Sequence, residues 1–137
     1  MRTMSLAYYS VAIAAAIPYL VLGLTLIPSR TVPARWGKGY DNRDPRRESE
    51  KLVGWRRRAH NAQANSYEVF PAFAASVIMA VTMRGSSPVI DAWAVAFVAS
   101  RVLFCAFYVT DLATARSTMW AIGALCIGAL FAIAAGA

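Results

Sequence analysis

Apolar residues fall in four long blocks along the chain, and polar segments separate them. The blocks cover about residues 5–27, 59–83, 89–110 and 118–135. Each block approaches or exceeds the ~20 residues that an α-helix needs to cross the hydrocarbon core of a bilayer. The pattern therefore predicts an all-α protein, a transmembrane four-helix bundle in which residues 1–137 form a single domain.

The connections between the blocks predict how the spans are arranged. Residues 28–58 form the only long polar connection, and Asp44 and Pro45 are expected to begin a short surface helix inside it. The turn at residues 83–88 is short, so the second and third spans must be antiparallel neighbours. Pro18, in the middle of the first span, predicts a kink that neighbouring helices can tolerate.

The distribution of charge predicts the orientation of the spans. The net charge is +7, and ten of the 14 lysines and arginines lie between Arg30 and Arg58. Such an excess in one loop is the positive-inside signature of the cytoplasmic side. We therefore expect the loop 28–58 in the cytoplasm and both termini on the outer side of the cytoplasmic membrane. This pattern indicates a lipid bilayer as the partner of the basic loop and no nucleic acid.

Several other side chains are interpreted as structural. Cys105 and Cys126 lie within spans and are expected to be buried thiols without a disulfide. No residues at metal-ligand spacing surround His60, so we predict an interfacial histidine and no metal site. Trp120, near the start of the fourth span, is expected to anchor it at the membrane interface. The fourth span also carries a ladder of small residues that lets another helix approach closely, made of Ala124, Gly128, Ala132 and Gly136.

Two ionisable residues lie deep within predicted spans, Glu68 in the second and Arg101 in the third. An ionisable side chain in the middle of the membrane costs ~2.5 to 3.5 kcal/mol on insertion scales, so it normally has a partner and a function. At ~1.5 Å per residue, Glu68 lies ~14 Å from the cytoplasmic end of its span. Arg101 lies at a similar depth in an antiparallel neighbour, so the two residues can pair.

Two polar stripes extend from this pair along the neighbouring helices. Residues at i, i+3, i+7 and i+10 share one helix face. The stripes are Arg58, Asn61, Asn65 and Glu68 in the second span and Arg101, Phe104, Tyr108 and Asp111 in the third. Arg116 and Ser117, at the cytoplasmic start of the fourth span, close the same end. Two interpretations stay open: the stripes form the wall of a pocket, or they form a structural polar network that fixes helix register.

The segment from Asn61 to Phe73 resembles the second-helix motif of the MAPEG superfamily, the membrane-associated proteins in eicosanoid and glutathione metabolism. The core of that motif, Asn-x-x-Glu followed by Pro-x-Phe, is present as Asn65, Glu68, Pro71 and Phe73. Further matches are Arg101 with Tyr108 seven residues later, and Arg116-Ser117 leading into Trp120. The length, the four spans and the long first loop agree as well. The pattern looks most like the bacterial members of the superfamily.

The resemblance implies a homotrimer with glutathione bound between neighbouring protomers in the cytoplasmic half of the membrane. Together with the loop charges, it leads us to expect a protein of the bacterial inner membrane with periplasmic termini. Its implied activity is that of a glutathione-dependent transferase or peroxidase acting on hydrophobic electrophiles or lipid hydroperoxides, with glutathione as co-substrate. The alternative is a non-catalytic MAPEG-like structural or small-molecule-binding membrane protein. Two departures favour this alternative: Asn61 stands where the motif commonly has arginine, and Phe104 where many members have tyrosine. Eicosanoid substrates are not expected.

The resemblance also implies roles for individual residues. Glutathione carries two carboxylates, an ammonium and a thiol, which arginines, a carboxylate and amides can bind. The implied glutathione-binding residues are Arg30, Arg58, Asn61, Asn65, Glu68, Arg101 and Tyr108. The catalytic role, stabilising the thiolate, is implied for Arg116 or Ser117, with Arg30 as a weaker candidate.

Overall fold

The computed structural model describes residues 5–26, 41 and 43–136, and over these residues it contains helices and no strands. Its elements are α1 (Leu6–Leu26), α2 (Pro45–Glu50), α3 (Gly54–Arg84), α4 (Pro88–Val109) and α5 (Ala113–Ala135). Four of these helices, all except α2, are long and apolar enough to cross a membrane. The all-α prediction is confirmed, and the long helices fit a transmembrane four-helix bundle.

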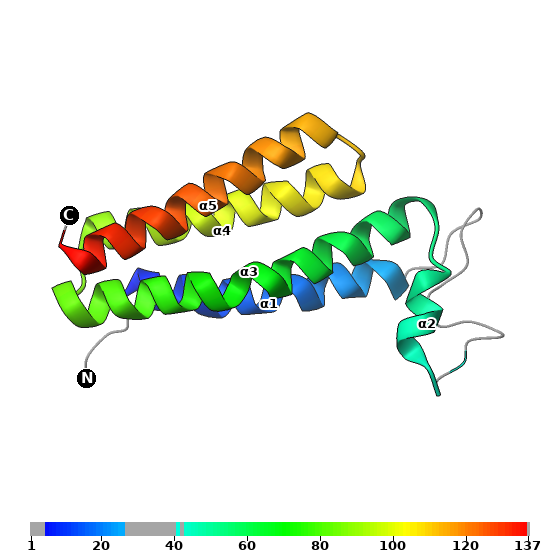
Figure 1. Ribbon diagram of the computed structural model, residues 1–137, viewed down its shortest axis with the longest axis horizontal. Helices are drawn as coiled ribbons and strands as arrows, with labels where there is room; N and C mark the ends of the chain where they lie inside the picture. Colours follow the sequence, from blue (N-terminus) through cyan, green and yellow to red (C-terminus); the bar gives the residue numbers. More distant parts are fainter. Residues whose placement is uncertain (1–4, 27–40, 42, 137) are drawn as a thin grey trace.

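The four long helices alternate in direction along the chain (Figure 1). α1 packs against α3 and α4, α5 packs against the same two helices, and α3 also contacts α4. The second and third spans are therefore antiparallel neighbours, as predicted. We call the end that carries α2 and the α4–α5 turn the loop end, and the end that carries the α3–α4 turn the turn end (Figure 1).

Local sequence explains where the helices of the loop end begin. The Asp44 carboxylate accepts a hydrogen bond from the Arg47 N–H at 3.2 Å, and Pro45 occupies the first helical turn of α2. The short surface helix expected here is confirmed. α3 begins at Gly54, so Arg56, Arg57 and Arg58, which were expected in the loop, form its first turns.

The turn between α4 and α5 is closed by backbone hydrogen bonds around Asp111. Asp111 adopts a left-handed conformation with φ of 65°. The Leu112 N–H donates to the Phe107 carbonyl at 2.9 Å, and the Asp111 N–H donates to the Tyr108 carbonyl at 3.3 Å. These bonds satisfy carbonyls that the end of α4 leaves without helical partners. The tight turn holds the start of α5 beside the end of α4.

The buried side chains form two clusters along the bundle. The cluster nearer the turn end is centred on Phe73 and Phe97, whose rings stack with centroids 3.8 Å apart. The cluster nearer the loop end includes Phe104 and Cys105. Both cysteines of the chain are buried and free. Gly123 lets α4 and α5 approach closely, since a Cβ there would lie 3.1 Å from the Ser100 hydroxyl. The small-residue ladder of α5 instead faces outward.

Candidate functional site

A hollow of about 420 Å³, which we call the site hollow, opens at the loop end between α3, α4 and α5. Its lining residues are Asn61, Ala64, Asn65 and Glu68 from α3, Phe104 and Tyr108 from α4, and Arg116, Ser117 and Trp120 from α5. Parts of three helices therefore meet around one space, and α3 contributes residues that are distant in sequence from those of α4 and α5. Of the two interpretations left open by the polar stripes, the geometry favours the wall of a pocket.

Helical spacing explains how each helix contributes to the site hollow. Asn61, Asn65 and Glu68 lie at i, i+4 and i+7, so their side chains project from one face of α3. Phe104 and Tyr108 lie one turn apart on α4. The third contribution comes from the first turns of α5, which the tight α4–α5 turn holds against the end of α4. The site hollow thus depends on the packing of α3 against both α4 and α5.

Arg101 and Glu68 are linked through Asn65 and not by direct contact. The Arg101 Nη2 donates to the Asn65 Oδ1 at 2.9 Å, and the Asn65 Nδ2 donates to the Glu68 Oε2 at 3.2 Å. Within the described ranges, no ion pair joins the guanidinium directly to the carboxylate. The two charges, which similar depth allows to meet, are instead joined through Asn65, because an amide has both a donor and an acceptor. This chain of contacts orients Asn65 and leaves the exposed Glu68 facing the site hollow.

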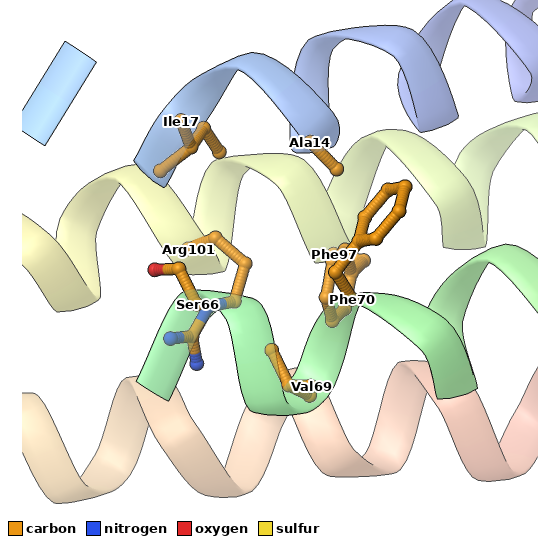
Figure 2. A pocket seen from close by; sticks show the side chains of 7 residues that line it. All are labelled: Ala14, Ile17, Ser66, Val69, Phe70, Phe97 and Arg101. Carbon is orange, nitrogen blue, oxygen red and sulfur yellow. The ribbon is translucent and has the colours of Figure 1, made fainter. Parts of the chain in front are cut away.

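The surroundings of Arg101 are closed and mostly apolar. The residue is 2% exposed, and its guanidinium lies 4.0 Å from the centre of the Phe104 ring. Figure 2 shows Arg101 and Ser66 together on one side of a small cavity, with Phe70 and Phe97 on the other. The cavity measures about 10 Å³, close to the space of one water molecule. The buried Nε of Arg101 has no hydrogen-bond partner among the described residues.

The Arg58 side chain contacts other groups of the protein at the loop end. Its Nη1 lies 3.7 Å from the Asp111 Oδ2, and its Nε donates to the Val109 carbonyl at 3.1 Å. Arg58 does not belong to the lining of the site hollow. Its role toward a ligand stays a prediction, and Arg30 lies outside the described residues.

The two implied catalytic residues are placed differently toward the site hollow. The Arg116 guanidinium lies 4.4 Å from the centre of the Tyr108 ring, which leaves its N–H groups available to acceptors in its own plane. The Ser117 hydroxyl donates to the Ala113 carbonyl at 3.1 Å, one turn earlier in α5. Its proton is therefore used within the helix, and its oxygen can still accept a hydrogen bond. Arg116 is the better placed of the two to bind an anion.

Trp120 is the lining residue that sequence reasoning assigned to another role. The role of interface anchor stays a prediction, and in addition its indole lines the site hollow and remains 51% exposed. Trp120 follows Arg116 by about one helical turn, and this spacing indicates that the two side chains share a face of α5. Trp120 and Phe104 add apolar surface to a hollow whose charged lining residues are Glu68 and Arg116. Such a lining suits a polar ligand with both charges and an apolar second molecule.

These features define a class of protein: an integral membrane bundle with a polar hollow at one end of its spans. A comparison with protein families finds that the model described as MAPEG family matches residues 6–136, nearly the whole chain. The chain belongs to the MAPEG family. No curated protein and no solved structure matches it. Membership associates the chain in general terms with glutathione-related functions of membrane proteins.

Proposed function

We propose that the protein is a membrane-embedded glutathione-dependent transferase or peroxidase acting on hydrophobic electrophiles or lipid hydroperoxides. The observation that carries the proposal is the site hollow, around which Glu68, Tyr108 and Arg116 converge from three helices. Its volume of about 420 Å³ falls in the range of sites that hold small molecules. Membership of the MAPEG family supports the same direction.

The lining offers partners for several groups of glutathione. Glu68 binds the ammonium of glutathione, and Asn65 hydrogen-bonds its peptide backbone. Arg101 acts through Asn65, whose amide it holds at 2.9 Å. Tyr108, on α4, donates a hydrogen bond from its hydroxyl to the peptide of glutathione. The carboxylates of glutathione bind arginines, for which Arg30 and Arg58 remain the candidates.

Arg116 promotes formation of the thiolate. A free thiol has a pKa of ~8.5, so the nucleophilic form is a minor species at neutral pH. A guanidinium beside the sulfur favours the thiolate by ~1.4 kcal/mol for each unit by which it lowers this pKa. In the transferase reaction the thiolate sulfur bonds to the electrophilic carbon, and the leaving group departs with its electron pair. In the peroxidase reaction the thiolate sulfur attacks one peroxide oxygen, the O–O bond breaks, and the alkoxide takes a proton and leaves as an alcohol. The resulting sulfenic acid reacts with the thiol of a second glutathione to give the disulfide and water.

The assembly we propose is a homotrimer in the bacterial inner membrane, with the loop 28–58 cytoplasmic and both termini periplasmic. Two features support further copies of the chain. The site hollow is open on one side, and the ladder on α5 faces outward, where a Cβ added to Gly128 meets no atom within 4 Å. Small residues on an outer face allow another helix to approach closely. The acceptor reaches Trp120 from the lipid phase, which suits hydrophobic substrates.

Substitution of two lining residues tests the proposal. Arg116→Gln and Glu68→Gln each remove one charge at nearly constant size, and Arg47→Gln removes an exposed charge of α2 away from the site hollow. With glutathione and a chlorinated aromatic acceptor, we expect the first two variants to lose about tenfold or more in kcat/KM, equivalent to ~1.4 kcal/mol. The Arg47→Gln variant keeps the activity of the parent. Unchanged activity in both Arg116→Gln and Glu68→Gln would remove the proposed site.

The second candidate is a non-catalytic MAPEG-like structural or small-molecule-binding protein. Asn61 lines the site hollow at a position where the motif commonly has arginine. An amide binds a carboxylate more weakly than a guanidinium does. Phe104 lines it without a hydroxyl. Calorimetry measures glutathione binding, and activity assays measure turnover of several electrophiles and hydroperoxides. Binding without turnover supports the second candidate.

A further inference from the structure

A second hollow, of about 450 Å³, lies between α2 and the first turns of α3. We call it the α2 hollow. Its lining residues are Pro45, Arg46, Ser49, Glu50, Arg57, His60 and Asn61. It shares Asn61 with the site hollow and has no other lining residue in common with it. The two hollows therefore adjoin, and apart from Asn61 the groups that the proposed glutathione chemistry uses do not line the α2 hollow.

The α2 hollow carries positive charge that the protein does not neutralise. Arg57 Nη1 donates to the Glu50 backbone carbonyl at 2.8 Å, which ties this guanidinium to the last residue of α2. Within the described part of the chain, neither Arg57 nor Arg46 forms an ion pair. Lys51 and Arg58, by contrast, pair with Glu48 and Asp111. Glu50 supplies the one carboxylate of the lining, so two guanidinium groups face a single acid.

The helical rise indicates that the α2 hollow lies at the depth of lipid headgroups. Arg57 precedes Glu68 by eleven residues of continuous helix, which places it ~16 Å nearer the loop end at ~1.5 Å per residue. Trp55 is half-buried two residues earlier, and tryptophan is enriched at membrane interfaces. Arginines at this level meet the phosphates of a bilayer that contains anionic lipids.

We propose that the α2 hollow binds one phosphate group, which the headgroup of an anionic phospholipid supplies. The planar guanidinium groups of Arg46 and Arg57 match the oxygens of a phosphodiester, which arginine binds through paired N–H donors. The Asn61 amide adds a donor on the α3 side, and the Glu50 carboxylate accepts a hydrogen bond from a headgroup hydroxyl. The proposal does not depend on glutathione, because neither arginine lines the site hollow.

Two adjacent arginines provide a matched test. Arg46 lines the α2 hollow and Arg47 does not, yet both are exposed residues of α2, and either change to glutamine removes one positive charge. The detergent-purified full chain is titrated with short-chain phosphatidylglycerol by calorimetry. We expect saturable binding of one lipid per chain, about tenfold weaker in Arg46→Gln and in Arg57→Gln and changed by less than about twofold in Arg47→Gln. A diffuse attraction between a basic surface and an anionic lipid would weaken all three variants equally, and that result would overturn the proposal.

Two further ligands separate the sources of the phosphate. Glycerol 1-phosphate is the soluble probe. If its binding weakens in the same arginine variants as lipid binding does, the result supports the phosphate site and shows that a soluble anion is a sufficient ligand. Binding of the lipid alone supports the site and identifies the membrane as its source. The matching diacylglycerol has the same chains without phosphate, and equally tight binding of this molecule contradicts the proposal. Because the Arg46 side chain makes no hydrogen bond or ion pair among the described residues, its variant tests the site without a cost in folding.

Discussion

The two ends of the bundle use their polar side chains differently. At the turn end, the Asp91 carboxylate accepts a hydrogen bond from the Ala7 N–H at 2.8 Å, and the Arg84 Nε donates to the Ile133 carbonyl at 3.1 Å. The acidic Asp91 thus lies at the N-terminus of α1, and the basic Arg84 lies at the C-terminus of α5. Each charge is opposite in sign to the helix-dipole end that it contacts. At the loop end, Glu68 faces a hollow instead of another helix terminus.

This difference shows which polar residues are available to a ligand. Each helix end leaves several backbone groups without partners, and side chains that satisfy them are no longer available for binding. By this criterion the Nε of Arg58 is used as Asp91 and Arg84 are, because it binds the Val109 carbonyl at the end of α4, and only the other N–H groups of Arg58 are left for a ligand. Arg116 contacts an aromatic ring and keeps its N–H donors. A site forms at the loop end because polar groups remain there after the helix ends are satisfied.

The largest effect on stability is expected at the apolar core nearer the turn end. Phe73→Ala removes a fully buried ring that stacks on Phe97, and the cavity lowers the free energy of unfolding by about 3 kcal/mol. Thermal unfolding in detergent measures the loss. Glutathione affinity per folded protein should stay the same, because Phe73 lies outside the site hollow. A selective loss of affinity would show that the two ends are not independent.

A smaller effect, on binding, is expected from Arg101→Met. The apolar chain keeps most of the volume but removes the donor that holds the Asn65 carbonyl at 2.9 Å. Asn65 then loses its orientation toward Glu68, and we expect glutathione to bind about tenfold more weakly, since a hydrogen bond to a charged group contributes about 1.5–3 kcal/mol. Calorimetry with glutathione checks this. Unaltered affinity would make Arg101 a purely structural residue.

The smallest effect is expected from the cap at the turn end. Asp91→Ala removes the acceptor of the Ala7 N–H, and a lost cap of this kind lowers the free energy of unfolding by about 1 kcal/mol. Asp91→Asn keeps an acceptor oxygen and serves as the matched control with a smaller loss. Kinetic constants with glutathione should match those of the parent in both variants. Equal destabilisation by alanine and asparagine would show that the charge, and not the hydrogen bond, matters here.

Helical periodicity predicted much of the candidate site. Asn61, Asn65 and Glu68 share a face of α3 because a helix repeats every ~3.6 residues, and all three line the site hollow. The short loop-end turn similarly explains why Arg116 and Ser117 lie beside them. Spacing also placed Arg101 at the depth of the α3 stripe, where its guanidinium reaches Asn65. What spacing lacked was the rotation of each helix about its own axis.

That rotation decides which partner a long side chain reaches. Arg101 binds Asn65 where equal depth had indicated Glu68, and Arg58 turns to Asp111 and the Val109 carbonyl. Close packing sets the rotation, as at Gly123, which brings the backbone of α5 against the Ser100 hydroxyl of α4. Such contacts depend on shapes from several helices at once, so no single stretch of sequence reveals them.

The sequence by itself determined the number of long helices, their alternating direction and the end of the bundle at which charged groups gather. These properties follow from the lengths of apolar blocks and of the turns between them, which are local quantities. Only the tertiary structure decided which polar atoms are satisfied by the protein and which face an open hollow. That division depends on side-chain packing among α3, α4 and α5, because hydrogen bonds form only where donor and acceptor are brought within about 3 Å of each other.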